Sequence, residues 1–153
     1  MRRLRKYLAL SPSGRRIVLY SLLLLPLVAA LLRARGMEHT RAWLTRHGRF
    51  AAGDTSALAP REIATLVGAA AALLRARCLS RSLLLCHLLH NRGASVEIRL
   101  GVTKHVDGSL SAHAWVEFDG LPLIDGLGVS KRYAALPLRG GVRCSGRPSP
   151  QFS

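Results

Sequence analysis

The feature that most constrains the fold is a long uncharged segment near the N-terminus. Residues 17–32 read IVLYSLLLLPLVAALL, bounded by Arg15 and Arg16 on one side and by Arg33 on the other. As a helix this segment spans roughly 24 Å, less than the roughly 30 Å of a bilayer's hydrocarbon core. Pro26 lies in its middle and predicts a kink. We expect a buried or partner-binding helix; a membrane-attached helix and a signal peptide are the alternatives.

The composition favours one folded domain with acidic partners. The chain has 153 residues, 49% of them hydrophobic, which suits a single domain with a modest core. Its 23 Lys and Arg residues exceed its 8 Asp and Glu residues, and the net charge of +15 attracts nucleic acid, anionic lipid or acidic peptides. Nucleic acid is disfavoured because the basic residues are scattered and few aromatic side chains can stack on bases.

The cysteines do not predict a disulfide framework. Cys78, Cys86 and Cys144 are odd in number, and no CxxC or paired Cys/His spacing is present. A reducing, cytoplasmic compartment is therefore expected. Cys86 lies among leucines and is interpreted as core, and Cys144 as incidental. His87 and His90 lie near Cys86, but a zinc site needs a second cluster that the sequence lacks, so we expect no metal or other cofactor.

The expected elements begin with helices. A first helix starts near Pro12 and ends at Gly36, and a short helix follows with Trp43 and Leu44 facing the core. The Ala/Leu-rich stretch after Pro60 predicts a helix of about four turns.

One more helix and an antiparallel meander follow. CLSRSLLLCHLLHNRG, residues 78–93, predicts a helix with one apolar face that ends at Asn91 and Gly93. SVEIRLGV alternates as a half-buried strand, and LSAHAWVEF and LPLID predict the next two strands. The fold class is therefore α+β. Three regions are expected: a helical N-terminal region (1–60), a core (61–141) and a flexible tail (142–153).

Cys78 stands at the predicted start of a helix. Helix N-termini present free N–H groups and a partial positive charge, which favour the thiolate over the thiol. Arg77 and Arg81 add positive charge nearby. Cys78 is thus either a nucleophile or a small buried hydrophobic residue, and its position alone does not decide between them.

His113 lies on the polar face of a predicted strand. Alternation puts His113, Trp115 and Glu117 on one face, while alanine, valine and phenylalanine occupy the other. We expect the apolar face to pack inward and the His113 face to meet the helix of Cys78. His113 could then activate the thiol, or it could be an ordinary strand histidine with a satisfied hydrogen bond.

Whether Asp125 can join His113 depends on the turn between the last two strands. A two-residue turn at residues 119–120 places Asp125 opposite Ala114, on the other strand face from His113. A three-residue loop at residues 118–120 places Asp125 opposite His113, about 5 Å apart at Cβ. We predict the three-residue register, which puts an orienting carboxylate beside the imidazole.

Two stretches together resemble a known family. They are CLSRSLLLCHLLHNRGASVEIRLGV (78–102) and LSAHAWVEFDGLPLID (110–125). Cys-Leu-x-Arg-Ser-Leu opening a helix, followed by Ala-His-Ala-Trp-Val-Glu, is similar to the transglutaminase-like core of the lasso-peptide leader peptidases. These form the C-terminal part of the lasso-peptide B proteins. The leucine-rich N-terminal helix resembles that family more loosely, where it belongs to a soluble protein.

The resemblance implies a transglutaminase-like or papain-like cysteine peptidase core. It assigns the nucleophile to Cys78, the general base to His113 and the orienting acid to Asp125. The implied substrate is a ribosomally made precursor peptide, cut between leader and core. An asparagine-synthetase-like cyclase then closes the macrolactam. A separate leader-recognition protein is expected, because the chain has no room for a fused one, and the apolar surface of the N-terminal helix could dock it.

Weaker candidates and other function classes complete the predictions. Trp115, Glu117 and Arg81 are candidate substrate contacts. A transglutaminase-like scaffold that binds a peptide without cutting it is one alternative, and a membrane-associated basic protein is another. An acyl transferase would use the same three residues, because hydrolysis and aminolysis share an acyl-enzyme.

Overall fold

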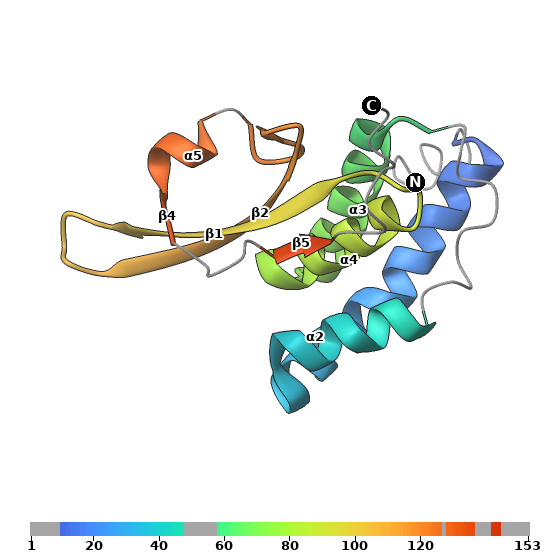
Figure 1. Cartoon of the computed structure of the whole chain (residues 1–153), viewed down its shortest axis with the longest axis horizontal. Helices are drawn as coiled ribbons and strands as arrows, with labels where there is room; N and C mark the ends of the chain where they lie inside the picture. Colours follow the sequence, from blue (N-terminus) through green and yellow to red (C-terminus); the bar gives the residue numbers. More distant parts are fainter. Residues whose placement is uncertain (1–9, 48–57, 127, 137–141, 145–153) are drawn as a thin grey trace, which may run out of the picture.

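Helices gather at one end of the molecule and a long antiparallel ribbon projects from them (Figure 1). The computed structural model describes residues 10–47, 58–126, 128–136 and 142–144. The helices are α2 (Pro12–His47), α3 (Pro60–Leu74), α4 (Cys78–His90) and α5 (Val129–Arg132). The strands are β1 (Val96–Lys104), β2 (Leu110–Phe118), β3 (Leu121–Pro122), β4 (Ala134–Ala135) and β5 (Val142–Cys144). The predicted α+β class is confirmed.

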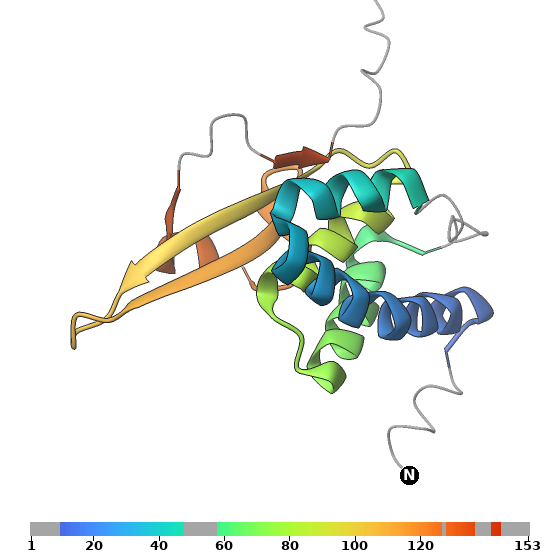
Figure 2. The same ribbon diagram turned by 90° about the horizontal axis from the view of Figure 1, so that it is seen from below.

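The sheet is built around the β1–β2 ribbon. All pairings are antiparallel in the order β3-β2-β1-β4, and β5 also pairs with β1. Helices α2, α3 and α4 pack at one end of the ribbon, and its other end extends past them (Figures 1 and 2). β5 takes up the first three residues of the segment that was predicted to be a tail, residues 142–153. Residues 145–153 lie outside the described residues.

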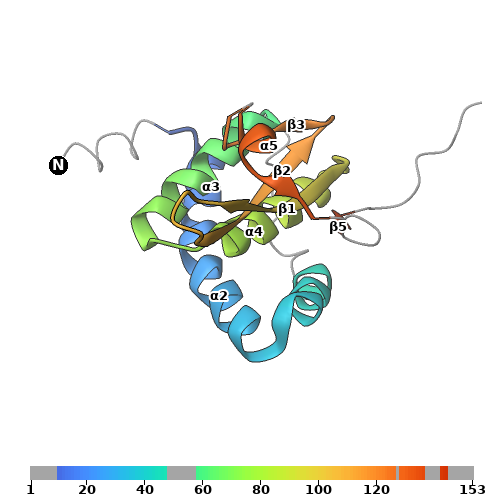
Figure 3. The same ribbon diagram turned by 90° about the vertical axis from the view of Figure 1, so that its left-hand side faces the viewer.

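Helix α2 has two segments that meet at Gly36. The backbone of Gly36 is non-helical (φ 74°, ψ −177°), a left-handed φ that glycine adopts without steric cost. Thr40 Oγ1 donates to the Gly36 carbonyl at 2.7 Å and satisfies the break locally. Figure 3 shows the chain changing direction between the segments. The predicted helix end at Gly36 is confirmed, whereas Pro26 keeps helical backbone angles.

The core lies between the helices and one face of the ribbon. From α2 it takes Ile17, Leu25 and Val28, which are at most 2% exposed. Ile63, Val67 and three alanines of α3 pack beside them. Val96, Ile98 and Val116 complete the core from the sheet. The N-terminal helix is thus partly buried, in agreement with the expected buried helix.

Helix α4 is the central element. It has the bounds predicted from sequence, Cys78–His90, and it contacts α2, α3, β1 and β2. Every residue from Ser82 to Leu89 is buried. The single apolar face predicted from periodicity is therefore wrong, because α4 is covered by helices on one side and by the sheet on the other.

Candidate active site

Cys78 is the first residue of α4. Arg77 precedes it in an extended conformation (φ −67°, ψ 152°), and the Arg77 carbonyl accepts the first helical hydrogen bond, from the Arg81 N–H at 3.1 Å. No side chain caps this end of the helix. Cys78 is a free, half-buried thiol. Its position matches the prediction: a thiol among the free N–H groups of a helix start.

The turn between β2 and β3 has the two-residue register, so the predicted three-residue register is wrong. Phe118 pairs with Leu121, and Glu117 pairs with Pro122. Asp119 (φ 50°) and Gly120 (φ 74°) are both left-handed, as a two-residue turn of this kind requires. In a continued strand this register would hold Asp125 on the face away from His113.

His113 and Asp125 nevertheless meet. His113 Nε2 lies 3.3 Å from Asp125 Oδ1, and the two side chains are 21% and 17% exposed. The reason is that β3 ends at Pro122, so alternation no longer fixes where Asp125 points. Ile124 turns toward the helices, with a methyl group 3.8 Å from the Cβ position that Gly68 of α3 leaves empty. Packing of this segment, not strand register, sets the contact.

Arg81 completes this cluster from α4. Its Nη2 lies 2.8 Å from both carboxylate oxygens of Asp125, and its side chain is 18% exposed. A charge-assisted contact of this length fixes the orientation of the carboxylate. Cys78 and Arg81 lie one turn apart on the same face of α4. The helix start is therefore tied through Asp125 to His113.

The other side of His113 is an aromatic cluster. The His113 ring stacks on Tyr133 at 5.1 Å between centroids and on Trp115 at 6.2 Å. Tyr133 follows α5, which lies across the ribbon from α4 (Figures 1 and 3). The face of His113 therefore meets the α5 segment rather than α4, which corrects the prediction. The Ala114 face meets α4 instead, since Val116 on that face packs in one core with the leucines of α4. The Ser82 hydroxyl of α4 also donates to the Ala114 carbonyl at 3.1 Å.

Gly101 makes room for these rings. It lies opposite His113 in the ladder. A Cβ there would stand 2.8 Å from Tyr133 Cβ and 3.0 Å from the Trp115 ring. Neither Gly101 nor Tyr133 was singled out from sequence. The available signals were a glycine inside a strand and a tyrosine at the start of YAALPL, where only a short contact was expected.

The three candidate substrate contacts all have internal partners. Trp115 is 1% exposed and donates through Nε1 to Glu117 Oε1 at 2.9 Å. Glu117 Oε2 accepts from Arg99 Nε at 3.0 Å. Arg81 holds Asp125 as described above. Each side chain thus has a structural partner, and contact with a substrate stays a prediction for all three.

Other predicted residues lie away from this cluster. Cys86 is fully buried, as expected, but it is disulfide-bonded, which the cysteine count did not predict. His87 lies near Tyr20 of α2, with Nε2 3.5 Å from the hydroxyl. Across the described parts of the chain, no three His, Cys, Asp or Glu side chains gather as a metal site would require.

A protein-family model for the transglutaminase-like superfamily matches residues 22–137, which is more than half of the chain. The chain belongs to the transglutaminase-like superfamily. Searches of curated proteins and of solved structures find no significant match. The match runs from within α2 to just past β4, so it covers Cys78, His113 and Asp125 together. Members of this superfamily are often cysteine hydrolases, which is the class of activity the cluster suggests.

Among the described residues the Cys78 thiol makes no hydrogen bond to His113. Asp125 therefore contacts both His113 and Arg81 directly, and Cys78 is linked to them only because it lies on the same helix as Arg81. In structures without substrate, catalytic hydrogen bonds are often long and tighten only in the complex.

Proposed function

We propose that the chain is a cysteine peptidase with a Cys78–His113–Asp125 triad. The observation that carries the proposal is the 3.3 Å contact of His113 Nε2 with Asp125 Oδ1, next to a helix that begins with a free cysteine. A carboxylate on one imidazole nitrogen fixes the tautomer and leaves the other nitrogen to serve the thiol. A scaffold that only binds peptides has no need of this arrangement.

The reaction has two steps. Cys78 Sγ gives its proton to His113 and attacks the scissile carbonyl, and the backbone N–H groups at the start of α4 supply hydrogen bonds to the oxyanion. His113 then protonates the leaving amine as the C–N bond breaks, which leaves an acyl-enzyme. His113 next takes a proton from water, whose oxygen attacks the thioester and releases the acid and the Cys78 thiol. Asp125 orients the imidazole in both steps.

The substrate class rests on the resemblance of residues 78–102 and 110–125 to the lasso-peptide leader peptidases. The substrate is then a ribosomally made precursor peptide, cut between leader and core. A separate recognition protein holds the leader, and an asparagine-synthetase-like cyclase uses the new amine.

Peptide mass spectrometry tests the activity. A lasso-type precursor peptide and its recognition protein are incubated with wild type, Cys78→Ala and His113→Ala. We expect cleavage at one bond, complete loss with Cys78→Ala, and a rate about 10²–10⁴-fold lower with His113→Ala. His105→Ala is the matched control, since His105 is exposed beyond the end of β1 and should cleave normally.

Two outcomes would redirect the proposal. Equal cleavage by wild type and Cys78→Ala would remove Cys78 from the mechanism. Peptide binding without cleavage by wild type would favour the non-catalytic scaffold. A product joined to an added amine, in place of the free acid, would identify an acyl transferase acting through the same acyl-enzyme.

Arg81 separates two roles in the same assay. As a positioning residue it orients Asp125, so Arg81→Met should lower kcat by about 10²-fold with little change in KM. As a substrate contact, the role first predicted, it should raise KM and leave kcat unchanged. Arg41→Met is the matched control, because Arg41 forms its ion pair with Glu38 on α2 and is no part of the candidate site.

A further inference from the structure

Helix α2 has two apolar faces, and only one of them is in the core. Ile17, Leu25 and Val28 pack against α3 and α4. On the outside, Leu19 is 52% exposed, Leu23 76% and Leu27 41%. These three leucines are four residues apart, so they form one continuous line along the helix, the outer ridge. Large exposed apolar surfaces of this kind usually mark an interaction site.

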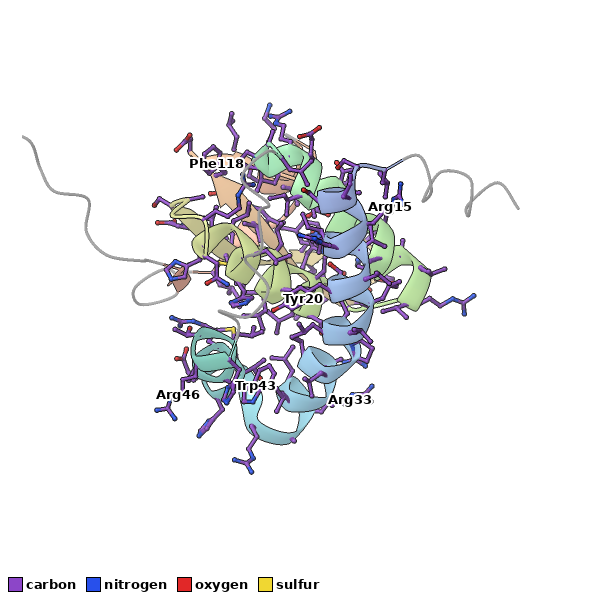
Figure 4. All side chains as sticks on the ribbon, turned by 90° about the vertical axis from the view of Figure 1, so that its right-hand side faces the viewer. Arg15, Tyr20, Arg33, Trp43, Arg46 and Phe118 are labelled. Carbon is purple, nitrogen blue, oxygen red and sulfur yellow. The ribbon has the colours of Figure 1, made fainter. Side chains whose placement is uncertain are left out.

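An arginine lies beyond each end of the outer ridge. Arg16 is exposed one turn before Leu19, and Arg33 is exposed after Leu27. No acidic residue occurs between Arg15 and Met37. Figure 4 shows α2 from the side, with Arg15 and Arg33 near the two ends of its first segment and Tyr20 directed toward the neighbouring helices.

The helix cannot cross a membrane and keep this fold. By length and composition alone it is long and apolar enough to span one, with a mean hydropathy of 2.2 over its most apolar window. A span would surround the whole helix with lipid, which would remove Ile17, Leu25 and Val28 from their contacts with α3 and α4. A partner of the outer ridge must therefore approach from one side.

A second copy of the chain is a poor partner for the outer ridge. Two ridges packed antiparallel would bring Arg16 of one copy against Arg33 of the other, and parallel packing would bring each arginine against itself. Like charges at an interface oppose association. An apolar surface flanked by phosphates complements both the leucines and the arginines of the outer ridge.

We propose that the outer ridge docks α2 on an anionic phospholipid surface. Leu19, Leu23 and Leu27 enter the boundary between headgroups and acyl chains, and Arg16 and Arg33 contact headgroup phosphates. Amphipathic helices bind membranes in this way, by buried apolar area together with attraction to anionic lipid. The helix lies in the plane of the surface while its core face stays packed on the protein. The inference does not depend on the proposed peptidase activity.

Vesicle co-sedimentation of the full chain tests this. The probes are vesicles of phosphatidylcholine alone and of phosphatidylcholine mixed with phosphatidylglycerol. We expect binding to the mixed vesicles only, a decrease with added salt, and about tenfold weaker binding for Leu23→Glu. Leu110→Glu is the matched control: it makes the same change at a leucine that is 73% exposed on the projecting ribbon, and it should bind like wild type.

Circular dichroism first establishes that both variants are folded. No binding of wild type to the mixed vesicles would overturn the proposal, as would equal loss of binding by Leu23→Glu and Leu110→Glu. Sedimentation velocity in the absence of lipid detects self-association. If wild type forms dimers that Leu23→Glu abolishes, and neither binds vesicles, the outer ridge is an interface between copies and the lipid proposal fails.

Discussion

The two halves of β2 have opposite surroundings. From Ala114 to Val116 the strand is buried on both faces, by α4 on one side and by the aromatic cluster on the other. At the other end Leu110 is 73% exposed, where the ribbon has left the helices. His113 stands between these halves, with its side chain 21% exposed. A candidate catalytic histidine is thus held by packed neighbours on one side and remains open to a substrate on the other.

The largest difference in stability is expected between two substitutions that each remove a large side chain from one half of β2. Trp115→Ala should destabilise the fold by about 3–5 kcal/mol, because it leaves a cavity under Tyr133 and His113. Leu110→Ala should change stability by about 0.5 kcal/mol or less, because its side chain is already in water. Urea unfolding followed by circular dichroism measures both. Similar losses for the two variants would mean that the ribbon is one uniform unit.

Periodic segments could be predicted from sequence because one interaction dominates in them. The bounds of α4 and β2 agree with the prediction: Asn91 and Gly93 end the helix, and residues 110–118 alternate to the end of the strand. Gly36 ended the first helix as expected, because its left-handed backbone has no helical continuation. In these segments local conformation and burial favour the same structure.

The candidate site was predicted less completely, because non-local packing decides it. The His113–Asp125 pair was expected, but by the wrong route: the strand was assumed to continue to Asp125, and it ends at Pro122. Where it ends depends on Ile124 packing against α3, about 55 residues earlier in the chain. Alternation carries no information on such a contact. Tyr133 was missed for the same reason, since nothing local predicts that it stacks on His113.

Gly101 lies opposite His113, where the buried and exposed halves of β2 meet. Gly101→Ala should destabilise by about 1–3 kcal/mol, because the new methyl group meets Tyr133 and the Trp115 ring at 2.8 and 3.0 Å. The ring movement should also lower peptidase activity, since both rings stack on His113. Thermal unfolding and the peptide assay measure the two effects.

Gly68→Ala is the control for Gly101→Ala. Gly68 lies inside α3, and its new methyl group would make only ordinary contacts with Ile124 at 3.8 and 3.9 Å. Alanine is also the better helix former, so Gly68→Ala should be neutral or stabilising by up to about 1 kcal/mol. Equal destabilisation by both substitutions would show that close contact with Tyr133 and Trp115 is not the reason that alanine destabilises the fold at position 101.

The turn between β1 and β2, at the exposed end of the ribbon, should show the smallest effect, a change in the pKa of Asp107. Asp107 Oδ1 accepts from the Ser109 hydroxyl at 2.7 Å and from the Ser109 N–H at 2.9 Å. These hydrogen bonds favour the carboxylate and lower the pKa of Asp107, the hydroxyl contributing most. Because the folded-state pKa is the lower one, the turn is stabilised at neutral pH, and this contribution is lost as the pH falls through that pKa.

Ser109→Ala should raise the pKa of Asp107 toward the ordinary aspartate value without reaching it, because the Ser109 N–H remains. NMR titration of the Asp107 carboxyl carbon measures the change, and Ser111→Ala, which removes a hydroxyl elsewhere on β2, should leave it unaltered. Cys78 reactivity should not respond to either variant. A response to Ser109→Ala would mean that the exposed end of the ribbon is coupled to the candidate site, and the two halves of β2 would no longer be independent.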